Sequence, residues 1–177
     1  PSDGRSVMGG ERQYLLEQVD DVAVVQIYAD GFESLERNDR ILAWHLYQAA
    51  LAGRDIYYDQ RYRHSLEMRE VLEEIIAHPR GVDPHVLAEI HRYTKLFWIN
   101  SGPYNNITAR KFVLGLEPEA FLEAARAAEA AGARFPCRPG ETLEGMLNRM
   151  RPLFFDASFE PSVTTKTPAD GGDMLAS

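Results

Sequence analysis

Side chains able to hydrogen-bond a peptide backbone gather where an apolar, helix-like run breaks at Gly102-Pro103 and continues as an extended segment. They are Asn100, Tyr104, Asn105, Asn106 and Lys111. Their polar groups suit the donors and acceptors of a peptide, and the Gly-Pro corner lets them approach the rim of a cleft without a Cβ clash. Because Asn side chains also satisfy backbone amides in turns, the pattern predicts either a substrate-cleft wall or an ordinary turn.

Metal chemistry has little support among the histidines. The histidines are His45, His64, His78, His85 and His91. A helical zinc site needs two histidines on one face with a carboxylate nearby, and none of these is followed by Glu in such a pattern. His85 and Glu89 stand one helical turn apart, a spacing that suits a metal clamp but is typical of a solvated surface pair. We therefore expect no metal ligand in this chain, and we expect His45, beside Trp44, to be a core histidine bonded to a backbone carbonyl.

Nucleophilic and acid–base chemistry are no better supported. Cys137 is the single cysteine, and it lies in a proline-flanked loop with Arg134 and Arg138 nearby but no histidine, so nothing there indicates an activated thiol. The sequence has no Gly-x-Ser-x-Gly turn and no phosphate-binding glycine loop. The acidic runs at 17–21 and 73–74 offer general acids, but such charges are usually solvated. We expect no catalytic residue in the chain.

Composition narrows the class of protein. A chain of 177 residues, 45% hydrophobic and 26% charged, is long enough for one globular core. Its formal net charge of −8 argues against a nucleic-acid partner, which would require clustered Lys and Arg. One cysteine without an intrachain partner favours the reducing cytoplasm. No apolar run approaches a membrane span, and residues 1–10 lack the apolar centre of a signal peptide; whether a segment preceded Pro1 stays open.

The elements that must position these side chains can be predicted from periodicity and from helix end signals. One or two short strands are expected within Tyr14–Tyr28, where Asp20-Asp21 separates two apolar runs. Helices are expected over Arg37–Tyr58, from about 66 to 76, from Asp83-Pro84 to the Gly102-Pro103 stop, over 117–131 and over 141–150. Gly53 is a weak point in the first of them. An extended segment is expected at 112–114. The predicted fold class is α+β and predominantly α-helical, with short N-terminal strands and about five helices.

The chain is expected to divide into three parts. Residues 1–10 are polar and glycine-rich and are predicted to be a disordered leader. Residues 11–159 are predicted to form one helical α+β domain, in which Trp44 and Phe97 anchor the core. Residues 160–177 are rich in Pro, Thr, Asp and Gly and are predicted to be an extended tail that leads into a missing remainder.

Three patches of the sequence resemble the N-terminal portion of the dipeptidyl peptidase III family. They are Gln13-Tyr14-Leu15-Leu16 with Asp21-Val22, the helix from Trp44-His45-Leu46 to Asp55, and Tyr93 to Leu116. The resemblance runs from about Arg12 to the last residue, and it depends on the order and spacing of the patches rather than on one diagnostic motif.

The resemblance implies a two-lobed zinc exopeptidase that removes dipeptides from the N-terminus of oligopeptides. This chain would be the opening part of the lower lobe, with zinc bound by residues of the full-length protein beyond this stretch and none bound here. The implied partners are an oligopeptide substrate and the remainder of the peptidase chain. The five side chains at 100–111 then become candidates for the cleft wall.

A second interpretation stays open, in which the chain is a free-standing, non-catalytic helical interaction module derived from the peptidase lobe. The coding sequence downstream of Ser177 distinguishes the two: an open reading frame with a His-Glu zinc motif supports the first, and a stop codon supports the second. A lobe separated from its remainder is also expected to expose apolar area, which favours self-association or dye binding.

Overall fold

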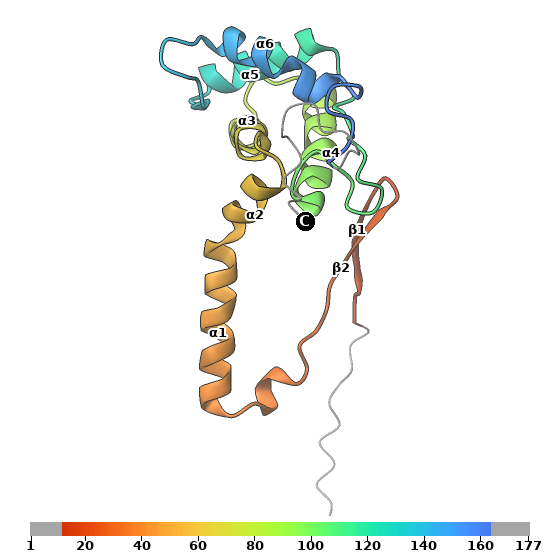
Figure 1. Cartoon of the computed structure of the whole chain (residues 1–177), viewed down its shortest axis with the longest axis vertical. Helices are drawn as coiled ribbons and strands as arrows, with labels where there is room; N and C mark the ends of the chain where they lie inside the picture. The colour runs from red at the N-terminus through yellow and green to blue at the C-terminus, as the bar shows by residue number, and fades with distance from the viewer. Residues whose placement is uncertain (1–11, 164–177) are drawn as a thin grey trace, which may run out of the picture. The chain divides into compact units, whose positions relative to one another are not determined.

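A computed structural model of the chain describes residues 12–163. It divides into two compact units, residues 1–47 and 48–177, with the boundary inside one long helix (Figure 1). The predicted domain of residues 11–159 therefore spans both units. The predicted leader of residues 1–10 and residues 164–177 of the predicted tail lie outside the part of the chain that the structure describes.

The first unit contains a hairpin of two antiparallel strands, β1 (Leu15–Val19) and β2 (Val22–Val25). Val19 pairs with Val22 across the turn at Asp20 and Asp21. Asp20 has a φ of 53°, a left-handed conformation that Asp tolerates better than most residues. A short 3₁₀ helix, η1 (Phe32–Ser34), comes next. The prediction of short strands within Tyr14–Tyr28 is confirmed.

The helix predicted over Arg37–Tyr58 is interrupted at Gly53. Helix α1 covers Arg37–Ala52 and helix α2 covers Arg54–Arg61, and α1 is drawn as one continuous orange helix in Figure 1. The Gly53 amide still donates to the Ala49 carbonyl at 2.9 Å, whereas the Gly53 carbonyl accepts from Ile56 in a tighter turn. Glycine is a poor helix former because its backbone is the most flexible, which explains why the helix breaks here.

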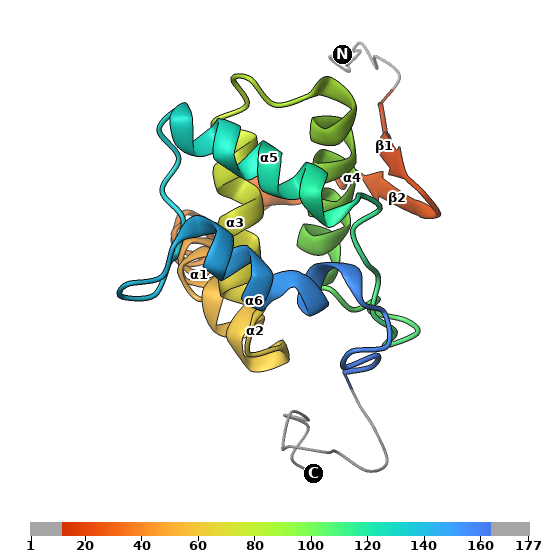
Figure 2. The same ribbon diagram turned by 90° about the horizontal axis from the view of Figure 1, so that it is seen from above.

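Four further helices belong to the second unit: α3 (Ser65–Ala77), α4 (Pro84–Asn100), α5 (Pro118–Ala130) and α6 (Leu143–Phe155). Helix α3 packs against α2, α4 and α5, and α5 packs against α4 and α6 as well. Within this unit α5 and α6 form a layer over α3 and α4 (Figure 2). The chain is thus α+β and predominantly helical over residues 12–163, as the sequence predicts, with six α-helices there.

The predicted helix ends are mostly confirmed. Asp83 caps α4 through one carboxylate oxygen, which accepts from the amides of His85 and Val86 at 2.9 and 3.1 Å. Helix α6 begins after Thr142, whose hydroxyl accepts from the Gly145 amide at 3.0 Å. Helix α6 differs from its prediction, since it continues through Pro152 to Phe155 instead of ending at residue 150.

Burial explains that difference, because Leu153 and Phe154 are 4% and 1% exposed. Their burial offsets the hydrogen bond that proline cannot donate.

Aromatic side chains from three helices form the core of the second unit. Tyr93 and Phe97 of α4, Phe121 of α5 and Phe154 of α6 are each 0–1% exposed. The ring centroids of Phe121 and Phe154 lie 5.1 Å apart, and those of Tyr93 and Phe112 lie 5.4 Å apart. These separations are those of favourable aromatic pairs. The prediction that Phe97 anchors the core is confirmed.

The prediction that Trp44 anchors the core is wrong. Trp44 is 57% exposed, no residue of α1 is buried, and His45 is exposed too. The expectation that His45 is a core histidine is therefore also wrong. The apolar spacing in α1 predicted its helical conformation correctly, but the spacing alone cannot say what covers the apolar side chains.

Candidate functional site

The segment after α4 contains the five side chains that sequence analysis singles out, and its corner is built by the backbone. Ser101 takes the left-handed conformation at φ 53°, and Gly102 comes next with φ 144°. A Cβ at Gly102 would come within 2.9 Å of the Ser65 hydroxyl oxygen. This position therefore requires glycine for both its φ and its close approach to α3.

Hydrogen bonds of Asn100 and Asn106 join the end of α4 to the turn that follows it. The buried Asn100 amide donates to the Leu96 carbonyl at 2.8 Å, and its oxygen accepts from the Asn106 backbone amide at 2.9 Å. The Asn106 side chain donates to the Ile99 carbonyl at 3.3 Å. Asn100 thus ends α4 and holds the start of the following turn.

Asn105 shapes the tip of the loop. Its side-chain oxygen accepts from the backbone amides of Ile107 and Thr108, both at 2.9 Å, which is the Asx turn that Asn commonly forms. Ile107 is 93% exposed and Asn106 is exposed beside it. The tip therefore presents polar and apolar groups to solvent on a fixed backbone.

Tyr104 and Lys111 form the base of the loop, where they pair in an isolated antiparallel bridge. The Tyr104 hydroxyl donates to the Glu160 carbonyl at 2.8 Å and the Tyr104 side chain is 1% exposed. Arg110 forms a second bridge to Ser162. The base is therefore attached to the segment that comes after α6.

Lys111 makes the strongest polar attachment in the loop. Its ammonium donates to the carbonyls of Pro152, Asp156 and Phe159 at 2.8, 2.9 and 2.9 Å. Lys111 is 8% exposed, and burial lowers the pKa of its amine to about 8. A cation at the end of a helix is favourable because the last carbonyls have no partner within the helix, so Lys111 acts as a cap for α6.

Glu160 links this base to the end of α2. Its carboxylate accepts from the Tyr62 hydroxyl and, at 2.6 Å, from the Arg63 guanidinium. Sequence reasoning missed Glu160, because Tyr62 and Glu160 are separated by 98 positions and nothing in local spacing brings them together.

The structure therefore sorts the five candidates into two groups. Asn100, Tyr104 and Lys111 are buried and attach the loop to α4 and α6, whereas Asn105 and Asn106 shape and form its tip. Contact between any of the five and a substrate stays a prediction. Two open depressions of about 490 and 500 Å³ lie elsewhere on the second unit, and none of the five lines them.

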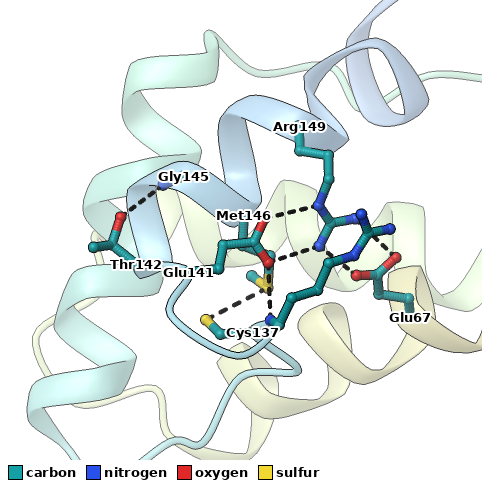
Figure 3. Close-up of polar contacts among 8 residues, drawn as sticks. Glu67, Cys137, Glu141, Thr142, Gly145, Met146 and Arg149 are labelled. Atoms are coloured by element: carbon teal, nitrogen blue, oxygen red, sulfur yellow. Dashed lines mark hydrogen bonds and ion pairs between the residues drawn. The ribbon is translucent and has the colours of Figure 1, made fainter.

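A second polar cluster lies between α3 and α6, centred on Arg149 (Figure 3). Its guanidinium donates to Glu67 at 2.6 Å and to Glu141 at 2.8 Å. The bond from Arg149 and the Arg138 backbone amide lower the pKa of Glu141 to about 2. Both carboxylates accept from the same cation, so this cluster joins α3, α6 and the segment before α6 by ion pairs.

Cys137 lies beside this cluster with its thiol 3.9 Å from the Met146 sulfur (Figure 3). Burial raises the pKa of the thiol, with a further contribution from the negative charge of Glu141. Raising the pKa depletes the thiolate, which is the reactive form. The surroundings of Cys137 are therefore those of a packed thiol.

The other candidates for chemistry have structural partners. Glu89 accepts from Arg92 at 2.6 Å and from the Gly115 amide at 2.8 Å. Its carboxylate therefore bonds to these two groups rather than to His85. Glu73 accepts from the Trp98 indole at 2.8 Å. Among residues 12–163, no group of three or more His, Cys, Asp or Glu side chains could hold a metal ion. None of the helices described is long and apolar enough to cross a membrane.

Comparison with known proteins adds no assignment: no family model matches the chain, and no curated protein matches it.

Proposed function

We propose that this chain is the N-terminal part of a zinc-dependent dipeptidyl peptidase, resembling the dipeptidyl peptidase III family, that removes dipeptides from the N-terminus of oligopeptides. In this proposal the second unit is a scaffold, and the loop of residues 100–111 is a wall of the substrate cleft. The chain acts in the cytoplasm together with the remainder of the peptidase, and it is inactive alone.

The anchored loop is the observation that supports this role. Its base is held by the three carbonyl contacts of Lys111 and by the bond from Tyr104 to Glu160. Its tip is exposed and shaped by Asn105. A wall that recognises a peptide needs this combination, because a fixed backbone loses little conformational entropy when the peptide binds.

Zinc enters this proposal only through the remainder of the peptidase. The residues described here do not form a ligand set for it, so no step of peptide hydrolysis is assigned to them. The proposed contribution of this chain is to bind and orient the oligopeptide through the exposed tip of the loop.

A second candidate function is the non-catalytic interaction module, and one observation favours it. Ile41, Trp44, Tyr47 and Leu51 of α1 are 45–57% exposed. Apolar side chains gathered on one helix usually mark a surface that another protein segment covers.

Metal content distinguishes the two candidates. Purified and dialysed, the 177-residue chain should retain no stoichiometric zinc, and the protein expressed from the longer reading frame should retain about one equivalent. A reading frame that stops at Ser177 would contradict the peptidase proposal. One equivalent of zinc bound by the 177-residue chain and lost in His85→Ala or His91→Ala would contradict the division of roles.

A further inference from the structure

The segment of residues 159–163, the strap, follows α6 and contacts the base of the loop after α4. Two backbone hydrogen bonds join the strap to the loop. The Lys111 amide donates to the Pro161 carbonyl at 3.0 Å. The Val163 amide donates to the Ala109 carbonyl at 3.2 Å. This is the pattern of an antiparallel pair of strands, so the strap lies against the loop as an extended chain.

Consecutive carbonyls of the strap accept from donors at the loop base. The Phe159 carbonyl accepts from the Lys111 ammonium at 2.9 Å, and the Glu160 carbonyl accepts from the Tyr104 hydroxyl at 2.8 Å. With the Pro161 carbonyl, three successive residues are bound through their backbone. Backbone acceptors are common to every peptide, so these contacts recognise an extended chain rather than a particular sequence.

The Glu160 side chain adds a specific contact to this backbone pairing. Its carboxylate accepts from the Tyr62 hydroxyl and, at 2.6 Å, from the Arg63 guanidinium. Arg61 donates to a backbone carbonyl of the loop at 3.1 Å. The cations of Arg61, Arg63 and Lys111 thus contact the strap or the loop base, in a chain whose formal net charge is −8. Such donors favour a carboxylate over a neutral side chain.

The strap itself is held weakly. None of residues 156–163 is buried. The side chains that it contacts are the buried ones: Tyr62, Tyr104 and Lys111 are 6%, 1% and 8% exposed. Glu160 has a φ of 47° and precedes a proline, a combination that is strained for a residue with a Cβ. A strained segment without buried side chains opens more readily than the helices around it.

We propose that the strap occupies, in cis, a binding site for an extended acidic peptide, and that such a peptide can take its place. The site is formed by Tyr62, Arg63, Tyr104 and Lys111. Its ligand has a carboxylate side chain where the strap has Glu160. The site lies at the base of the loop rather than at its exposed tip, and the inference does not depend on the peptidase proposal.

The strap competes with any free peptide because it belongs to the same chain. A tethered segment has an effective concentration on the order of millimolar. The apparent affinity of a free peptide is reduced by the fraction of molecules in which the strap is closed. A change that displaces the strap should therefore strengthen the binding of a free peptide.

A synthetic peptide with the sequence of residues 156–163 tests the proposal, with its binding to the 177-residue chain measured by fluorescence anisotropy. Glu160→Lys removes the carboxylate from the strap and places a positive charge beside Arg63. The peptide should bind this variant at least about tenfold more tightly than the wild-type chain. Glu70→Lys, the same change of charge at an exposed position on α3, should bind the peptide as the wild-type chain does.

The peptide itself tests the preference for a carboxylate. Carrying the change Glu160→Gln, it should bind the Glu160→Lys chain about tenfold more weakly than the unchanged peptide does. Circular dichroism of each variant chain checks that the fold is retained.

Hydrogen exchange of the wild-type chain is an independent test that needs no variant. The amides of Lys111 and Val163, which join the strap to the loop, should exchange at least about tenfold faster than the amide of Tyr93 within α4. This measurement decides the question if Glu160→Lys loses its fold.

Three outcomes would overturn the proposal. Equal binding of the peptide to the wild-type and Glu160→Lys chains would mean that the strap does not occupy a peptide site. Equal binding of the Glu and Gln peptides would mean that the carboxylate is not recognised. Exchange of the strap amides only at the rate of global unfolding would mean that the strap is a fixed part of the fold.

Discussion

The Lys111 ammonium lies 2.8 Å from the Pro152 carbonyl oxygen and joins the loop after α4 to the end of α6. Two further carbonyls, of Asp156 and Phe159, complete its set of acceptors. This contact makes the position of the loop dependent on α6, although the two segments are separated by 41 positions in the chain.

Replacing Lys111 should therefore destabilise the protein. Lys111→Met keeps the apolar stem but removes the donor of three hydrogen bonds, and the loss of these charged hydrogen bonds should cost about 1–3 kcal/mol. Urea unfolding measures the loss. Arg110→Met, at an exposed neighbouring position, is the matched control and should change stability by less than about 0.5 kcal/mol. Equal stability of both variants would show that the Lys111 contacts contribute nothing net.

The ion pairs around Arg149 predict that the stability of the protein depends on pH in the acid range. The pKa of Glu141 is lowered from 4.5 to about 2 in the folded protein, so the unfolded chain binds its proton first as the pH falls. The contribution of Glu141 is complete above pH 4.5 and is lost as the pH falls from there through about 2.

Urea unfolding at several pH values should show this loss in the wild-type chain. In Glu141→Gln the loss of stability in acid that is due to this carboxylate should be absent. Glu70→Gln, at an exposed position on α3, should lose stability in acid as the wild-type chain does. The same acid dependence in wild type and Glu141→Gln would contradict the role of the pair.

Trp44 and Phe97 should differ sharply in their effect on folding. Phe97 is 0% exposed, and Phe97→Ala should cost about 3–5 kcal/mol through the cavity it leaves. Trp44→Ala should cost less than about 1 kcal/mol when measured on dilute monomer, because its side chain already faces solvent. Thermal melting of both variants provides the comparison, and a large loss in Trp44→Ala would show that α1 is covered within the monomer.

Asn100 and Asn106 separate the framework of the loop from its tip. Asn100→Ala removes an acceptor from the Asn106 amide and should destabilise the chain by about 1–3 kcal/mol. Asn106→Ala removes only a 3.3 Å bond at an exposed site and should cost less than about 1 kcal/mol. Urea unfolding compares them, and if the order were reversed the tip rather than Asn100 would carry the stability of the loop.

The sequence predicts most of the helices because their ends have specific signals. Asp83-Pro84, Glu117-Pro118 and Gly102-Pro103 each mark a boundary that the structure contains within a residue or two. The periodicity of α1 predicts a helix equally well, yet the burial of Trp44 inferred from it is wrong. Periodicity reports a common side of a helix, whereas burial depends on what lies against that side.

The candidate site is predicted less completely, for a physical reason. Turn chemistry identifies Asn105, and the helix stop identifies Asn100. Glu160 and the Arg149–Glu67 pair stay hidden because the partners are distant in sequence, so no local spacing indicates them. Lys111 is found by sequence, but its three carbonyl partners come from the end of α6 and become visible only in the fold.

The products formed from a synthetic oligopeptide test the central claim most directly. Where the reading frame continues beyond Ser177, the protein expressed from it is incubated with the peptide, with and without a zinc chelator, and the products are measured by mass spectrometry. Our account predicts successive loss of two residues from the N-terminus, abolished by the chelator and absent with the 177-residue chain alone. An intact peptide, or cleavage at other positions, would contradict the assignment of this chain to a dipeptidyl peptidase.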